Sequence, residues 1–447
     1  MRETKRQMIP YSFYDRTGIE RHLTRMAEKG WLLCKIGFFW RYRRIEPKKL
    51  SFCVCYFPRA TVYDPGPSEG QEEFYEFCAH AGWTLAGASG QLQVFYNERE
   101  DPVPIDTAPE LELEAIHQSA KKSFLPPYFL LLGLGVLNLF QYLWRAFDDP
   151  ITTLSSVPIL LSFVSGAILI WIAGTELIAY FLWRRRALAA AERGEFLPTR
   201  SHFWFQWLAL AILLSATAWQ LADLFRDGLG GVTAVVVIGL AGLIAAVSAL
   251  RAGLKKGNFS AQTNQRVTVG ACVVLSILFA VAIPRFVVRG LDSRPEPKSG
   301  DLPLTVGDLL EADFDYSQSL SRQESPLLTH LSARQSPWRH GEMKDAPSLD
   351  YGVTVVKAPF LYGTCKSHVL GWWDRPGENW IPQSRTDPVD PAPWGAEEAY
   401  QVVYLKSGPQ DKYVLCYPDR IVEIGLDWTP TPEQMAVIGG KLGRGPL

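Results

Sequence analysis

Residues 231–250 read GVTAVVVIGLAGLIAAVSAL and contain no charged side chain. The hydrocarbon core of a bilayer is about 30 Å thick and is crossed by about 20 residues of α-helix. This stretch therefore predicts a membrane-spanning helix, and similar stretches lie on both sides of it. Together they predict a multi-pass α-helical membrane protein with five spans, near residues 125–146, 157–183, 203–225, 231–252 and 267–289.

Basic residues flank alternate ends of these spans. One set of flanks contains Lys121, Lys122, Arg184, Arg185, Arg186, Arg193, Arg200, Arg251, Lys255, Lys256 and Arg266. The other short loops hold only Arg145 and Arg226. Because Lys and Arg are enriched in cytoplasmic loops, we expect a cytoplasmic N-terminus and, after five crossings, a C-terminal domain outside the cell.

Four basic residues oppose this orientation. Arg285, Arg289, Arg294 and Lys298 follow the last span on the side expected to be outside. Long domains translocate largely regardless of charge, so the short loops decide the prediction. An extra or missing span would place the C-terminal domain on the other side.

Both ends of the chain have the mixed composition of soluble domains. We expect a cytoplasmic α+β domain over residues 1–115, a membrane region over 116–290 and an extracytoplasmic α+β domain over 302–447. The formal net charge of −1 gives no basic footprint for nucleic acid, so nucleic-acid binding is not expected.

A short motif occurs twice in the N-terminal domain. AEKGWLL at residues 27–33 and AHAGWTL at 79–85 each follow a helix-like run. Gly30 and Gly82 are placed to end a helix, and Trp31 and Trp83 to anchor the strand that follows. The pattern predicts strand–helix–strand–strand twice, over 8–49 and 50–98, paired into one antiparallel sheet with its helices on one face.

The local signals extend this prediction. The first strand is expected at residues 8–14, followed by a helix over 16–29 whose N-cap is Asp15.

Three segments of this region carry a family resemblance. ERHLTRMAEKGWLL, FFWRYRRIEPKKLSFCVCYF and EFCAHAGWTLAGASGQLQVFY resemble the bacterial domain of unknown function 2812, over about residues 11–115. The resemblance implies a membrane-anchored protein with a role in bacterial envelope regulation, whose gene lies near those of PadR-type repressors. We expect the protein in the bacterial plasma membrane. It supplies no catalytic residues. The expected partners are the lipid bilayer and either a PadR-type repressor or a membrane transporter.

The C-terminal domain shows strand and helix patterns. Strands are expected in YGVTVVKAPF (351–360), in EEAYQVVYLKSG (397–408) and as a hairpin within residues 412–426. A closing helix is expected after them, with Thr431 or Thr429 near its cap. Cys365 and Cys416 form either a disulfide or two buried free thiols, and both readings stay open. Four tryptophans form either a binding platform or core filling: Trp372, Trp373, Trp380 and Trp394.

Glu176 is the intramembrane charge of greatest interest. A buried carboxylate in a span marks a candidate functional site, but snorkelling toward the cytoplasmic end of the span, or pairing with an arginine such as Arg184, explains it without function. The chain has no hydrolase, zinc-protease, phosphate-loop or C-x-x-C motif, so no catalytic, cofactor or metal site is expected.

Three functions remain open. We favour a non-enzymatic sensor, regulator or scaffold that couples the outer domain to the cytoplasmic one. The alternatives are an accessory subunit of an export or resistance transporter and a membrane enzyme without a recognisable motif.

Overall fold

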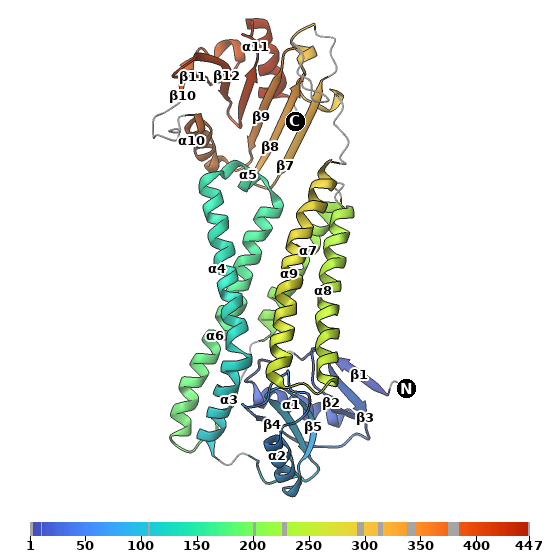
Figure 1. Ribbon diagram of the computed structural model, residues 1–447. Coiled ribbons are helices and arrows are strands. Elements are labelled where there is room, and N and C mark those ends of the chain that lie inside the picture. The colour runs from blue at the N-terminus through green and yellow to red at the C-terminus, as the bar shows by residue number, and fades with distance from the viewer. Residues whose placement is uncertain are drawn as a thin grey trace. The chain divides into compact units, whose positions relative to one another are not determined.

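The computed structural model describes residues 3–9, 11–105, 108–199, 203–225, 230–292, 299–311, 316–337, 346–373 and 384–445 (Figure 1). The chain divides into two compact units. The first comprises Met1–Val136 and Ser165–Asp292, and the second Leu137–Val164 and Ser293–Leu447.

The first unit begins with two copies of one folding motif. The first copy comprises β1 (Thr4–Gln7), α1 (Arg16–Glu28), β2 (Trp31–Lys35) and β3 (Trp40–Arg44), and the second β4 (Ser51–Tyr56), α2 (Glu69–His80), β5 (Thr84–Ser89) and β6 (Leu92–Asn97). Each copy forms a three-stranded antiparallel sheet, in the orders β1-β3-β2 and β4-β6-β5. The element order is the predicted strand–helix–strand–strand repeat.

Two details of that prediction are wrong. The first strand lies at Thr4–Gln7, ahead of the expected 8–14, because the polar run TKRQ pairs with β3 at the edge of the sheet. The two copies also form separate hydrogen-bonded sheets instead of one. Their strands β2 and β5 nevertheless lie side by side, and a Cβ on Gly87 would meet Ile36 Cγ1 at 3.4 Å.

Local signals define both helices. Asp15 caps α1 by accepting a hydrogen bond from the Gly18 amide at 3.0 Å, as expected from its position. Gly30 and Gly82 follow the two helices with φ of 76° and 84°, a region that side chains with a Cβ rarely enter. Each glycine therefore lets the chain turn sharply from helix to strand.

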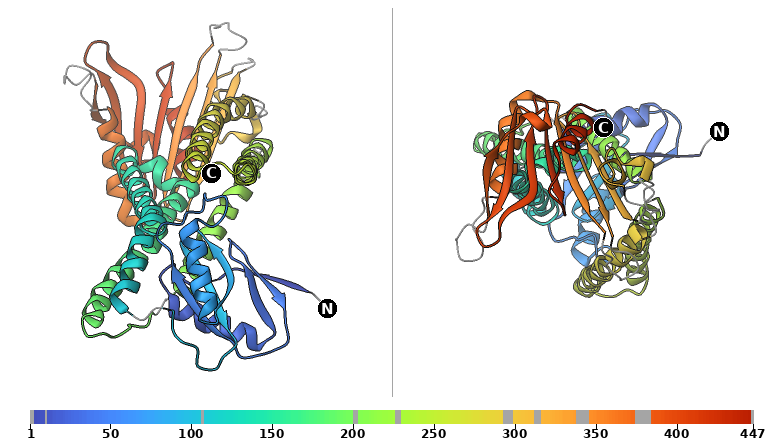
Figure 2. Two further views of the ribbon diagram at one scale, coloured as in Figure 1. Left: turned by 60° about the horizontal axis from the view of Figure 1, so that its bottom comes forward. Right: turned by 90° about the horizontal axis from the view of Figure 1, so that it is seen from above.

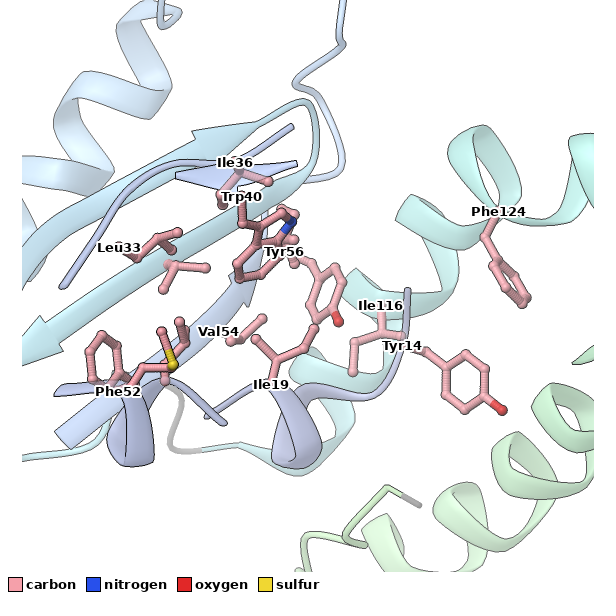
Figure 3. Close-up of a cluster of buried hydrophobic side chains, with 14 of the residues drawn as sticks. Tyr14, Ile19, Leu33, Ile36, Trp40, Phe52, Val54, Tyr56, Ile116 and Phe124 are labelled. Atoms are coloured by element: carbon pink, nitrogen blue, oxygen red, sulfur yellow. The ribbon is translucent and has the colours of Figure 1, made fainter. Parts of the chain in front are cut away.

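The core of this unit extends beyond the repeats. Helix α3 (Pro109–Ser123) leads directly into α4 (Leu125–Asp148), and Ile116 and Phe124 are buried with side chains of the first copy (Figure 3). Tyr14, which precedes α1, belongs to the same cluster, and so does Tyr180 of α6 (Val157–Ala191). The N-terminal domain therefore shares its core with the ends of two long apolar helices.

Four helices of the described residues are long and apolar enough to cross a membrane. They are Leu125–Asp148, Val157–Ala191, Thr233–Lys256 within α8 (Gly230–Lys256) and Ala261–Ala282 within α9 (Ala261–Asp292). Helices α8 and α9 pack side by side (Figure 1). The span expected near 203–225 corresponds to α7 (Phe203–Leu224), whose apolar segment Gln206–Ala222 is not counted among these four.

The second unit is built on a seven-stranded antiparallel sheet with the order β10-β11-β12-β13-β9-β8-β7 (Figure 2). The strands are β7 (Ser317–Glu324), β8 (Leu328–Ser336), β9 (Leu349–Val356), β10 (Ser384–Val389), β11 (Glu398–Tyr404), β12 (Gly408–Cys416) and β13 (Arg420–Leu426). The predicted strands correspond to β9, β11 and the β12–β13 hairpin, whereas β7, β8 and β10 were not predicted.

One face of this sheet is covered by apolar packing. Leu331, Val353, Leu415 and Val422 are buried there against the closing helix α11 (Pro432–Ile438) and other apolar side chains. Since side chains alternate across a strand, the neighbouring residues point to the opposite face.

Within the described residues, the opposite face is covered only in part. Helices α5 (Pro150–Ser155) and α10 (Tyr362–Trp373) pack against Leu328, Val414 and Ile421. The segment between α4 and α6 therefore belongs to the core of the C-terminal domain.

Tyr14 tests whether the N-terminal domain and the helix ends form one core. Its side chain is 2% exposed, and Tyr14→Ala should lower the free energy of unfolding by about 3–5 kcal/mol. The measurement is thermal unfolding of the full chain in detergent. Phe38→Ala is the control, because Phe38 is 77% exposed. An equal effect of the two substitutions would contradict the shared core.

Candidate functional site

Polar side chains form rows across the partly covered face of the C-terminal sheet. One row runs Ser319, Arg334, Asp350, Gly425 and Lys412 across β7, β8, β9, β13 and β12. Each pair of neighbours in this row is in direct register. The strand pairing therefore brings two cations and a carboxylate from distant parts of the sequence onto one face.

The next rows add an acid and three hydrogen-bonding side chains. Ser332, Gly352 and Glu423 are direct neighbours in the second row, and His330 pairs with Thr354 in the third. His330 Nδ1 lies 2.9 Å from Thr354 Oγ1, which fixes the imidazole on this face.

Two glycines hollow this face. A Cβ on Gly352 would lie 3.6 Å from His330 Cε1 and 3.8 Å from Glu423 Oε2, and one on Gly425 would lie 2.9 Å from Asp350 Oδ1. Glycine inside a strand often marks a place where another molecule approaches the backbone. Here the missing side chains leave a cavity of about 560 Å³, which Trp373 also lines.

Burial changes the protonation of two of these groups. It raises the pKa of Glu423 to about 7 and lowers the pKa of His330 below its usual value. Glu423 therefore exchanges its proton near neutral pH beside an uncharged imidazole. Perturbed titratable groups in a cavity are typical of binding and catalytic sites.

A smaller cavity of about 200 Å³ adjoins the first. His330 and Glu423 line both cavities, and the smaller one is completed by residues of α5 and α10 and the residue before α5. There His368 Nε2 lies 3.8 Å from Asp149 Oδ1, the side chain that caps α5. The candidate site thus reaches the segment that joins α4 to α6.

The two predicted cysteines lie beside this site. Cys365 on α10 and Cys416 on β12 are both buried and both free thiols in the structure. Burial raises the pKa of Cys365 to about 11, which keeps that thiol protonated and unreactive at neutral pH. A bridge between the two residues stays a prediction.

The two repeat tryptophans have different surroundings. Trp83 is buried, and its indole N–H donates to the Val103 carbonyl at 2.9 Å. Trp31 is partly exposed and lies under the Arg44 guanidinium at 5.0 Å. Neither residue lines the two cavities of this site.

Glu176 is buried in α6, and Ser12 of the N-terminal domain donates a hydrogen bond to its carboxylate. The pairing with Arg184 that the sequence suggests is not found in the described part of the chain. The domain reaches this carboxylate because its core packs directly on α6.

The tryptophan cluster separates into two environments. Trp394 is buried and packs on Tyr413 at 4.9 Å between ring centroids, whereas Trp372 is 53% exposed. Trp380 lies outside the described residues. Among the described tryptophans of the cluster, Trp373 lines the larger cavity and Trp372 the smaller one.

Sequence patterns alone did not single out Glu423, Asp350, Arg334 or Lys412. A sequence signal for the site was nevertheless present. Polar residues alternate along β8, β9 and β13, and this alternation is interrupted by a glycine in two adjacent strands, Gly352 in β9 and Gly425 in β13. No group of three or more His, Cys, Asp or Glu residues suited to a metal ion occurs within the described ranges.

Comparison with known proteins identifies only the N-terminal domain. A family model described as "Protein of unknown function (DUF2812)" matches residues 15–125, so this region is a domain of that family. The match includes α3, which packs in the same core. No curated protein and no solved structure matches the chain.

Glu423 should make stability depend on pH. Between the usual carboxyl pKa of 4.5 and about 7, the folded protein retains a proton that the unfolded chain has lost. The free energy of unfolding should therefore fall as pH rises through this window, by up to about 3 kcal/mol, and then level off. Glu423→Gln mimics the protonated form and should abolish this fall.

Thermal unfolding of the full chain in detergent, from about pH 5 to about pH 8, measures the effect. Glu397→Gln is the control, because it alters an exposed carboxyl of the same domain. A pH profile that is the same in Glu423→Gln and in the unmodified chain would contradict the assignment.

Proposed function

We propose that this membrane protein, with its DUF2812-family domain at the N-terminus, is a sensor that couples a ligand site in its C-terminal domain to its N-terminal domain. The observation that carries the proposal is the hollowed polar face of the C-terminal sheet, where cations and carboxylates surround a cavity of about 560 Å³. This volume lies in the range of small-molecule sites.

The charges of this face indicate the class of ligand. Arg334 and Lys412 supply positive charge, and Asp350 and Glu423 supply carboxyl groups, around the same cavity. A small zwitterion, such as a free amino acid or a short peptide, would satisfy both signs at once. A purely apolar ligand would leave these groups desolvated and unpaired.

Contacts within each unit support five membrane crossings. Ser325 donates to the Leu154 carbonyl at 2.6 Å, so the segment after α4 belongs with the C-terminal sheet. Thr199 donates to Asp15 at 2.6 Å, and Arg251 to the Val62 carbonyl at 2.7 Å, so the chain after α6 and the end of α8 belong with the N-terminal domain. These contacts support a membrane crossing by α7 as well.

Orientation follows from the basic residues. Those at the ends that belong with the N-terminal domain, including Arg184 and Lys255, favour a cytoplasmic side for that domain in a bacterial plasma membrane. The C-terminal site would then face the outside, where it would meet extracellular or periplasmic solutes.

Two helices, α4 and α6, connect the two domains along the chain. Helices α4 and α6 enter the N-terminal core through Phe124 and Tyr180 and are joined at their other ends by α5, which packs in the C-terminal core. The cytoplasmic output we propose is contact with a regulator, a PadR-type repressor being the candidate that the family resemblance suggests.

A second candidate function is acid–base catalysis in the same cavity. It is favoured by the raised pKa of Glu423 beside the neutral imidazole of His330. Chemical analysis of the ligand after incubation with the protein distinguishes the sensor from the enzyme. A sensor releases the ligand unchanged, whereas an enzyme converts it into a product.

Ligand binding can be tested by thermal stabilisation of the full chain in detergent. Free amino acids should raise the unfolding temperature, whereas matched simple amines and carboxylates should not. Gly352→Val fills the floor of the cavity and should weaken binding at least about tenfold. Gly363→Val, at an open position on α10, is the control.

Two results would overturn this assignment. One is the failure of every zwitterion to bind, and the other is unchanged binding by Gly352→Val. Coupling between the C-terminal site and the N-terminal domain is tested separately, by hydrogen exchange of residues 60–64 in the N-terminal domain. If the protein is a sensor, the exchange rate of these residues must change when a ligand binds to the C-terminal site.

Membrane topology can be tested with the chain's own exposed thiol. Cys34 is exposed in the N-terminal domain, and Lys406 is exposed in the C-terminal domain. An impermeant maleimide is added to cells in which only the outer barrier has been permeabilised. It should modify the introduced thiol of Lys406→Cys. It should reach Cys34 only after the cells are lysed. Labelling of both thiols from the same side would contradict five crossings.

A further inference from the structure

Another cavity lies in the first unit, between the N-terminal domain and the end of α8. It has a volume of about 370 Å³ and is bounded by residues 60–67, the ends of β2 and β5, and the last turns of α8. It shares no lining residue with the site in the C-terminal domain.

The cavity concentrates positive charge. Lys35 of β2 and Arg251 and Lys255 of α8 line it, together with one carboxylate, Asp64. That carboxylate already accepts hydrogen bonds from the Thr61 amide at 2.5 Å and the Thr61 hydroxyl at 2.9 Å. No ion pair joins any of the three cations to an acid within the described part of the chain.

Placing three cations around one cavity is unfavourable, because like charges repel. An anion bound between them would offset this cost. The excess of positive charge therefore favours an anionic ligand over a neutral or cationic one.

One wall of the cavity is fixed in place. Arg251 donates to the Val62 carbonyl at 2.7 Å, and its guanidinium lies 5.1 Å from the ring centre of Tyr63. Asn264 of α9 donates to the Tyr63 carbonyl at 3.0 Å. Residues 60–64, which we call the strap, are thereby bound to both helices of the α8–α9 pair.

The position of the cavity indicates which class of anion it binds. Arg251 and Lys255 lie in the last two turns of an apolar helix long enough to cross a membrane. Such helix ends lie at the level of phospholipid headgroups, where basic side chains meet lipid phosphates. A phosphate group is also small enough for a cavity of this volume.

We propose that this cavity is a phosphate-binding site that takes either the headgroup of an anionic phospholipid or a free phosphate compound. The phosphate bridges Lys35 of the N-terminal domain to Lys255 of α8. Its occupancy holds the domain, the strap and the α8–α9 pair together.

The test uses the full chain and the double variant Lys35→Ala/Lys255→Ala, which leaves the Arg251 contacts to the strap intact. The control is Lys256→Ala, which removes a neighbouring exposed cation that does not line the cavity. Thermal stabilisation is measured in vesicles of phosphatidylcholine with and without phosphatidylglycerol, and in detergent with inorganic phosphate or a nucleoside monophosphate. Ionic strength is held constant with chloride.

Stabilisation by phosphatidylglycerol alone identifies a lipid headgroup, and stabilisation by the soluble compounds identifies a free phosphate ligand. In either case the double variant should lose at least about tenfold in apparent affinity, and Lys256→Ala should lose less than about twofold. The proposal is overturned if no phosphate compound stabilises the chain, or if the double variant and the control respond alike.

Discussion

The packing of Tyr14 among aromatic rings is the contact on which the rest of the N-terminal unit depends. Its ring lies 5.2 Å from Tyr180, 5.2 Å from Trp183 and 5.7 Å from Phe124, measured between ring centroids. Phe124 stands at the junction of α3 and α4, and the other two rings belong to α6. Such ring contacts combine large apolar burial with directional geometry.

Because of this packing, the N-terminal domain is not suspended on a flexible linker. A displacement of α6 or α4 has to be accommodated by the core of the domain itself, since interiors are packed too densely to absorb it. The buried carboxylate of Asp15 adds a polar connection, as it caps α1 and also accepts from Thr199 beyond the end of α6.

Local signals in the sequence were enough to predict much of the fold. Asp15, Gly30 and Gly82 act through their own backbone neighbourhood, so their roles follow from a few residues. The strand Thr4–Gln7 could not be predicted in this way, because its polar sequence becomes a strand only by pairing with β3. The separation of the two small sheets likewise depends on how the copies meet.

The candidate site could be predicted less well from the sequence than the fold, for a related reason. His330, Asp350, Lys412 and Glu423 lie on four strands, and only the strand order and register bring them to one face. The raised pKa of Glu423 arises from burial, which no short motif encodes. Glu176 is similar, because its partner Ser12 is 164 residues away.

The position of α5 has a consequence for how the chain is assembled. Ile151 is buried with Leu328, Val369 and Ile421, which are synthesised much later than α5 itself. Contacts between such distant residues form slowly, since a long loop must close before they contribute. During synthesis the segment between α4 and α6 therefore keeps its apolar face uncovered until the C-terminal sheet has been made and has folded onto it. A chain that stops early would keep that face exposed, which gives the cell's proteases and chaperones a direct mark of an unfinished protein.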